Sequence, residues 1–284
     1  PARYHARMPH HIRTTSLAAL ALLLSLAGCT TQPASSGMLS PQPATQTPVV
    51  QPAAAPAAKA VKGYLSAQAV QSCADAFLAH YKSGDELVAI PAAANDLERM
   101  VTKHVGVGSS PAITASSQAD GKSEESESLW EFHRALGPKF SARNCGEIKA
   151  FIDLAFVDAK RVNSLVKKQF NRPRPSEADP KHPKQNPSFP SGHATTAGLR
   201  YKLLAAVSEA SPDAEIELFK QGWFMCYERL VVGVHYPSDI AAGFLLGEMV
   251  ADHVLKQAAA DPSGEAGKAL RAAKEQWRAV KVGG

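Results

Sequence analysis

The sequence predicts an all-α fold, a single helical domain that begins near Val61. Apolar residues recur with helical spacing over most of the chain after that point, and segments with strand-like alternation are scarce. About 220 residues are enough to enclose one hydrophobic core without a second domain. The expected helices are 61–82, 95–104, 129–136, 145–169, 193–208, 213–232, 238–255 and 264–280.

The first 28 residues resemble an export signal. They contain three arginines, no acidic residue, and an apolar run from Leu17 to Leu26 that is too short to span a bilayer stably. The run closes with Leu26-Ala27-Gly28-Cys29, which resembles the lipobox of bacterial lipoproteins, so we expect a lipid anchor on Cys29. Thr30 resembles an outer-membrane sorting signal, and the expected location is the periplasm. An ordinary cleavage site or an uncleaved anchor is the alternative.

The segment from Cys29 to about Ala60 is expected to be a flexible tether. It is rich in Pro, Ala, Gln, Ser and Thr and poor in charge and in large apolar residues, so it buries too little surface to fold. Removing residues 1–28 lowers the formal net charge from +5 to +2. The remaining chain, which includes the domain 61–284, therefore offers no case for nucleic-acid binding, and no apolar run after residue 28 reaches transmembrane length.

The segment from Arg229 to Asp239 carries a histidine and a carboxylate one helical turn apart. Asp239 follows His235 by four residues, and Pro237 predicts that a new helix starts just after His235. A carboxylate that accepts a hydrogen bond from one ring nitrogen leaves the other nitrogen unprotonated and nucleophilic. We therefore expect Asp239 to orient the ring of His235.

The segment Pro190-Ser191-Gly192-His193 predicts a turn that opens a helix. Ser191 is a good N-cap, and Gly192 lets the backbone approach a ligand closely. Backbone N–H groups at such a helix start bind phosphate, and His193 would lie beside the same anion as a general acid. The residues alone do not separate attack by His235 from attack by His193.

Three cations complete the pattern. Arg174 and Arg229 are suited to bidentate binding of phosphoryl oxygens, and Lys167 supplies a compact point charge. Fixed cations of this kind stabilise negative charge on a phosphoryl group during its transfer. Three further basic residues lie outside the pattern and are interpreted as surface residues: Lys168, Arg172 and His182.

The spaced motifs resemble a known family. Lys167-x6-Arg174-Pro175, then Pro190 to His193, then Arg229-x5-His235-x3-Asp239 is similar to the signature of the type 2 phosphatidic acid phosphatase (PAP2) superfamily, which includes vanadium-dependent haloperoxidases. The resemblance covers roughly residues 140–257. The short spacer after Pro175 and the soluble flanks look most like bacterial class A nonspecific acid phosphatases. One departure is Glu228, where the family usually has serine.

The resemblance implies a helical bundle of the PAP2 and haloperoxidase type and a metal-independent acid phosphatase that acts on small phosphate monoesters. It implies a phosphohistidine on His235, protonation of the leaving group by His193, and a phosphate site that needs no cofactor. The implied phosphate ligands are Lys167, Arg174, Ser191, Gly192 and Arg229. A lipid phosphate or diphosphate phosphatase and a vanadium-dependent haloperoxidase are the alternatives.

Three other features allow weaker expectations. In an oxidising periplasm one disulfide is possible, and Cys73 with Cys145 is the expected pairing, because Cys226 lies in an apolar segment. Residues 106–128 are expected to form a mobile loop that could border the site. The Ala- and Lys-rich helix 264–280 is typical of a packing or dimer element, so a homo-oligomer is possible.

Overall fold

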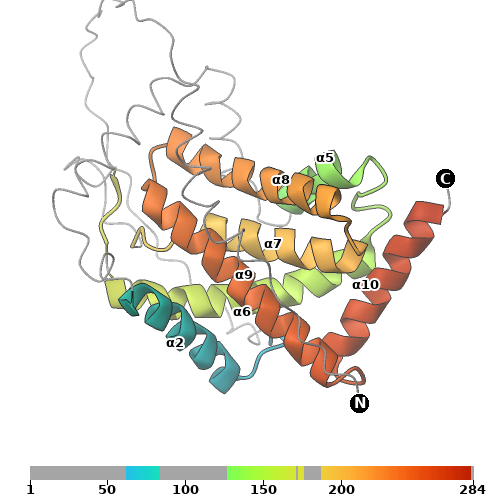
Figure 1. Ribbon diagram of the computed structural model, residues 1–284, viewed down its shortest axis with the longest axis horizontal. Helices are drawn as coiled ribbons and strands as arrows, with labels where there is room; N and C mark the ends of the chain where they lie inside the picture. The colour runs from blue at the N-terminus through green and yellow to red at the C-terminus, as the bar shows by residue number, and fades with distance from the viewer. Residues whose placement is uncertain (1–61, 84–126, 171, 176–186, 283–284) are drawn as a thin grey trace, which may run out of the picture. The chain divides into compact units, whose positions relative to one another are not determined.

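The computed structural model describes residues 62–83, 127–170, 172–175 and 187–282. This part of the chain contains helices and no strand, which confirms the all-α prediction (Figure 1). The elements are α2 (Ala67–Ser83), the 3-10 helix η2 (Glu127–Phe132), α5 (His133–Leu136), α6 (Gly146–Phe170), α7 (Gly192–Ser208), α8 (Pro212–Val231), α9 (Pro237–Ala260) and α10 (Glu265–Val282).

The expected helix 61–82 begins only at Ala67, because the residues before it bind other helices. Residues 62–66 form an irregular N-terminal strap. In this strap the N–H of Leu65 donates to Oδ2 of Asp158 at 2.9 Å, and the carbonyl of Tyr64 accepts from Nε2 of Gln257 at 2.8 Å. Tertiary partners thus satisfy backbone groups that a helix would otherwise pair.

Other predicted segments differ in start or lie outside the described residues. The segment predicted at 129–136 begins as the 3-10 helix η2 and becomes α-helical at His133. The helix expected at 95–104 and most of the loop expected at 106–128 are not described. The leader 1–28 with Cys29 and the tether 29–60 are likewise not described, so the domain boundary stays a prediction.

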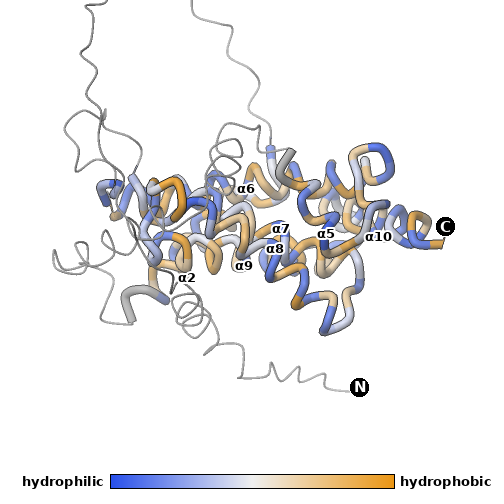
Figure 2. The backbone as a smooth tube through the Cα atoms, turned by 90° about the horizontal axis from the view of Figure 1, so that it is seen from above, coloured by the Kyte–Doolittle hydropathy of each residue, from blue (hydrophilic) through white to orange (hydrophobic). Residues whose placement is uncertain are grey.

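Helix α7 is the central element of the bundle. It packs against α6, α8, α9 and α10, and every residue from Ala194 to Tyr201 is buried. Such a run covers more than two helical turns, so this part of α7 has no face open to water. Figure 2 shows hydrophilic and hydrophobic residues alternating along the helices around it, as expected for elements that bury one face.

Glycines allow α7 and α9 to approach closely. A Cβ on Gly247 would lie 2.1 Å from the carbonyl oxygen of Thr195, and a Cβ on Gly243 would lie 2.4 Å from that of Ser191. Because the contacts advance together along both helices, α7 and α9 run in the same direction and start at the same end. The N–H of Ser191 donates to the carbonyl of Asp239 at 2.9 Å. This packing brings together two motifs that are separate in the sequence.

The helix-start signals at Ser191 and Pro237 are confirmed. Ser191 caps α7, and its hydroxyl accepts an N–H from the first turn. Ser211 caps α8, which begins at Pro212. Helix α9 begins at Pro237, so His235 lies at the junction that the proline predicted.

The three described cysteines are all buried and free. The expected disulfide between Cys73 and Cys145 is therefore wrong. Burial raises the pKa of the Cys73 thiol to about 12 and also raises the pKa of Cys145. Thiols that stay protonated are poor nucleophiles and poor metal ligands, so packing is their role in this core.

None of the helices in the described residues has the length and apolar character needed to cross a membrane.

Candidate active site

His235 and Asp239 form a buried pair at the start of α9. His235 is 2% exposed, and Asp239, in the first turn, is fully buried. Nδ1 of His235 lies 3.4 Å from Oδ2 of Asp239, and the same oxygen accepts the N–H of Tyr236 at 2.9 Å. The carboxylate thus faces one ring nitrogen of His235 and leaves Nε2 on the opposite side.

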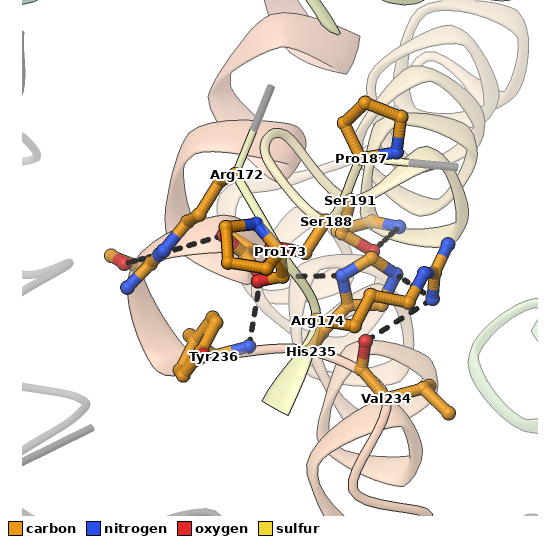
Figure 3. Close-up of polar contacts among 12 residues, drawn as sticks. Arg172, Pro173, Arg174, Pro187, Ser188, Ser191, Val234, His235 and Tyr236 are labelled. Carbon is orange, nitrogen blue, oxygen red and sulfur yellow. Dashed lines mark hydrogen bonds and ion pairs between the residues drawn. The ribbon is translucent and has the colours of Figure 1, made fainter. Parts of the chain in front are cut away.

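Arg172 is buried, so its interpretation as a surface residue is wrong. Its Nη1 donates to Oδ1 of Asp239 and to Oγ of Ser238, both at 2.7 Å, and its guanidinium lies 3.8 Å from the ring centre of Tyr236 (Figure 3). Asp239 is therefore held between an arginine and His235. Arg172 fixes the carboxylate that orients the histidine.

The local sequence carried a signal for Arg172. In Arg172-Pro173-Arg174-Pro175 each arginine precedes a proline, which favours an extended backbone. Alternate residues of an extended segment point the same way, so both arginines reach the start of α9. Lys168 is exposed, as expected, and His182 lies outside the described residues.

Arg174 and Lys167 approach His235 from the segment that precedes α7. Nη1 of Arg174 lies 3.4 Å from Nε2 of His235 and donates to the carbonyl of Val234 at 3.1 Å (Figure 3). Lys167, in the last turn of α6, donates from Nζ to the carbonyl of Pro187. Desolvation, followed by the charge of Arg174, lowers the pKa of Lys167 to about 8. Two cations are therefore held close enough to repel each other.

Ser191, Gly192 and His193 form the N-terminus of α7. Ser191 is fully buried as the cap, whereas His193 is exposed. A Cβ on Gly192 would meet nothing closer than Oδ1 of Asn163 at 3.9 Å, so space is open in front of the helix. The N–H groups of a first turn have no intrahelical partner and favour an anion there.

Arg229 approaches the start of α7 from α8. It lies in the last turn of α8 and is 8% exposed. Its charge acts on His193, as do those of His235 and Arg174. The preceding residue, Glu228, is also buried. The ends of α6, α7, α8 and α9 thus supply most of the site residues that the sequence predicted, while Arg174 comes from the extended segment 172–175 and His235 from the junction before α9.

Asn163 was not predicted from the sequence. It lies on α6, one turn before Lys167, and its Nδ2 donates to Oγ1 of Thr195 at 2.9 Å. The bond links α6 to α7 beside Gly192. No local pattern marks this residue, because its partner is 32 positions away in the chain.

Both imidazoles of the site favour the neutral form. Burial lowers the pKa of His235, although the hydrogen bond and charge of Asp239 oppose the change. Desolvation, followed by the charges of Arg229, His235 and Arg174, lowers the pKa of His193 to about 3. The neighbouring positive charges thus act on the pKa of His193 in the same direction as desolvation. A phosphate placed among the same cations would offset their charge and raise the pKa of His193.

The arrangement combines an oriented neutral imidazole, a second imidazole and three cations around a helix N-terminus. These groups suit phosphoryl transfer, in which a nucleophile attacks phosphorus and fixed positive charge stabilises the equatorial oxygens. Within the described residues, no group of three or more His, Cys, Asp and Glu side chains could hold a metal ion.

A model of the PAP2 superfamily matches residues 152–261. The match makes this segment similar to the PAP2 superfamily. It includes every site residue described above, from Asn163 and Lys167 on α6 to Asp239 on α9. The resemblance inferred from the motif spacing is therefore confirmed at the level of the family.

Curated relatives match shorter stretches. The chain is 38% identical over 64 residues to a non-specific acid phosphatase of Salmonella typhimurium, which covers 22% of this chain and 24% of the relative. It is 34% identical over 99 residues to an acid phosphatase of Zymomonas mobilis, a match that covers 31% of this chain and 36% of the relative. It is 38% identical over 60 residues to a lipid A 1-phosphatase of Rhizobium etli, a match that covers 21% of this chain and 25% of the relative. The matches thus span between 24% and 36% of these relatives' lengths.

Among solved structures, the chain is similar to a transmembrane PAP2 type phosphatidylglycerolphosphate phosphatase from Bacillus subtilis. The TM-score is 0.48 at 19% identity, over 69% of this chain and 98% of that chain.

Proposed function

We propose that this chain is an acid phosphatase that hydrolyses phosphate monoesters through a phosphohistidine on Nε2 of His235. The observation that carries the proposal is the buried pair of His235 and Asp239, whose outward nitrogen lies 3.4 Å from Arg174. A carboxylate on one ring nitrogen makes the other a nucleophile, and a guanidinium beside that nitrogen is suited to a phosphoryl oxygen.

In the first half-reaction, Nε2 of His235 attacks phosphorus and the bond from phosphorus to the ester oxygen breaks. Lys167, Arg174 and Arg229 stabilise the charge on the phosphoryl oxygens, together with the N–H groups at the start of α7. The departing alkoxide takes a proton from His193, and the alcohol leaves. Asp239 stays ionised and stabilises the positive charge that develops on His235.

In the second half-reaction, His193 acts as a base. It takes a proton from a water molecule, whose oxygen attacks phosphorus as the bond from phosphorus to His235 breaks. Inorganic phosphate leaves, and both histidines return to their starting state. Because the fixed cations meet the phosphoryl charge throughout, the proposed mechanism needs no metal ion.

The pKa shifts support activity at acid pH. His235 must be neutral to attack, and its lowered pKa keeps it neutral below the usual range of histidine. His193 must be protonated to act as an acid, and a pKa of about 3 in the free site means that substrate binding or low pH must supply that proton. Phosphate monoesters lose their second proton near pH 6, so the monoanion that dominates below this pH can bring the proton with it.

The proposal is tested by trapping the intermediate. Protein incubated with labelled aryl phosphate and quenched under alkaline denaturing conditions should carry the label on His235, because phosphohistidine survives alkali. His235→Ala should abolish labelling and turnover, whereas His253→Ala, the same change at a half-buried histidine farther along α9, should preserve both. Label on any other residue, or turnover by His235→Ala, contradicts the mechanism.

We also propose that the chain acts in the periplasm, attached to the outer membrane by a lipid on Cys29. The support is the leader sequence with its lipobox-like ending. Cys29→Ser should remove the full-length protein from the detergent-soluble outer-membrane fraction or leave it uncleaved. Unchanged processing and fractionation would rule out lipidation at this residue.

A further inference from the structure

A pocket of about 660 Å³ opens beside the phosphate site, between α6 and the start of α7. It shares Lys167 and Gly192 with that site. Helix α6 supplies most of the remaining wall, through a face of residues at helical spacing, and α7 supplies two threonines. The other lining residues are Phe156, Ala159, Lys160, Asn163, Ser164, Lys168, Pro187, Thr195 and Thr196. A substrate whose phosphate lies at Gly192 can therefore extend its alcohol along α6.

The lining of the pocket is strongly basic. It includes Lys160, Lys167 and Lys168, and none of the lining residues that the structure describes is acidic. The ammonium of Lys160 lies 4.4 Å from the ring centre of Phe156, which also lines the pocket. This contact places the charge of Lys160 at the pocket wall.

Lys160 lies at a defined separation from the phosphate site. It precedes Lys167 by seven residues, which is about 10 Å along a helix axis. Between them, Asn163 uses its Nδ2 to bind Thr195, while its Oδ1 faces Gly192. An amide oxygen accepts hydrogen bonds and repels anions. The part of the pocket next to the phosphate site is thus suited to a neutral group, and the far part to an anionic one.

We propose that this pocket is a leaving-group subsite for phosphate esters whose alcohol carries a second anionic group, such as another phosphate. Lys160 binds the second group and Lys168 adds positive charge at the rim. This inference rests on the proposed phosphatase function. One phosphate is transferred to His235 and released, and the alcohol leaves with its other phosphate intact.

The test compares α,ω-alkanediol bisphosphates of increasing chain length with alkyl monophosphates of the same lengths. For each length, the ratio of kcat/KM for the bisphosphate to that for the monophosphate is measured. A bisphosphate has two phosphates that can be hydrolysed, which alone gives a ratio of two. Binding at the subsite should raise the ratio above two by a further factor of about 3 to 10, since an exposed charged contact contributes modestly. It should peak at one chain length, because Lys160 is fixed on α6.

Two double variants make the test specific. Lys160→Glu with Lys168→Glu should remove the preference at every length. Lys139→Glu with Lys256→Glu changes the net charge equally at exposed lysines that do not line the pocket, and it should retain the preference. Circular dichroism of both variants checks that they fold.

Each result has one meaning. Hydrolysis of aryl and alkyl phosphates without a bisphosphate preference overturns the subsite and leaves the proposed function intact. A preference that both double variants lose equally also overturns it, because long-range attraction of anions would then explain the preference. Failure of the wild-type protein to hydrolyse any of these esters overturns the proposed function itself.

Discussion

Two buried aspartates, Asp158 and Asp239, have environments that look alike. Both are fully buried, and both accept a backbone N–H at 2.9 Å, from Leu65 and Tyr236 respectively. Each also forms an ion pair with an arginine, at 3.0 Å for Asp158 and 2.7 Å for Asp239. Burial and partners alone would assign the two carboxylates the same role.

Their pKa values nevertheless move in opposite directions. Burial raises the pKa of Asp158 above its usual range, against the N–H of Leu65 and the charge of Arg161. Burial acts on Asp239 in the same sense, but the hydrogen bond and charge of His235 and the charge of Arg172 hold its pKa below the usual range. The side chain of Arg161 is 36% exposed, whereas that of Arg172 is 4% exposed, so water screens only the first pair strongly.

The difference separates the carboxylate of the proposed active site from a structural one. Asp158 binds the N-terminal strap to α6. It lies so close to the strap backbone that a Cβ on Gly63 would be 2.3 Å from its Oδ1. Asp239 has a second partner, a histidine whose other nitrogen faces a cluster of cations. The functional residue is marked by partners that require it to stay charged, rather than by burial.

The largest expected contrast is in turnover. Asp239→Asn keeps the size of the side chain but removes the charge that orients and stabilises His235, so kcat should fall by about 10²- to 10⁴-fold. Asp158→Asn should change kcat little and lower the urea midpoint instead. Steady-state assays and urea unfolding of both variants check this. Similar kcat losses in the two would remove the distinction between them.

The next contrast concerns the two arginines. Arg172→Gln leaves a buried carboxylate without its main cation and should lower the free energy of unfolding by about 3–5 kcal/mol. Arg161→Gln breaks a pair that water already screens and should cost about 1 kcal/mol or less. Urea unfolding at neutral pH measures both. A larger loss for Arg161→Gln would show that the strap, rather than the start of α9, depends on its ion pair.

The smallest contrast is in the pH dependence of stability. The pKa of Asp158 is raised in the folded state, so ionisation of Asp158 lowers the stability of the protein as pH rises above 3.8. The pKa of Asp239 is lowered in the folded state, so the ionised Asp239 contributes stability that is lost as pH falls below 3.8. Relative to wild type, Asp158→Asn should therefore gain stability with rising pH above 3.8. The deficit of Asp239→Asn should shrink as pH falls below 3.8. Unfolding curves across the acidic range measure both slopes, and slopes of the same sign would contradict the opposite shifts.

Most of the fold was predictable because its signals are local. Ser191 and Pro237 mark helix starts by their own chemistry, and the spacing of His235 and Asp239 falls within one turn. The motifs also predicted which residues would gather, although the sequence did not show that parallel packing of α7 and α9 brings them together.

What the sequence missed depends on distant partners. Arg172 was expected at the surface because a charged residue is usually exposed, and its partner Asp239 lies 67 positions away. Asn163 has no charge or motif to mark it. The strap before Ala67 was predicted as helix because its propensity allows one, while its backbone bonds are set by Asp158 and Gln257.

The cation cluster couples the stability of this protein to the anions around it. Lys167, Arg174 and Arg229 are held together against their mutual repulsion, so a ligand that neutralises them binds the folded chain far better than the unfolded one. By mass action, such a ligand at one hundred times its dissociation constant adds about 2.7 kcal/mol to the free energy of unfolding. Inorganic phosphate, the product of the proposed reaction, is itself such a ligand. Inorganic phosphate should therefore slow this protein and protect it from unfolding through the same contacts.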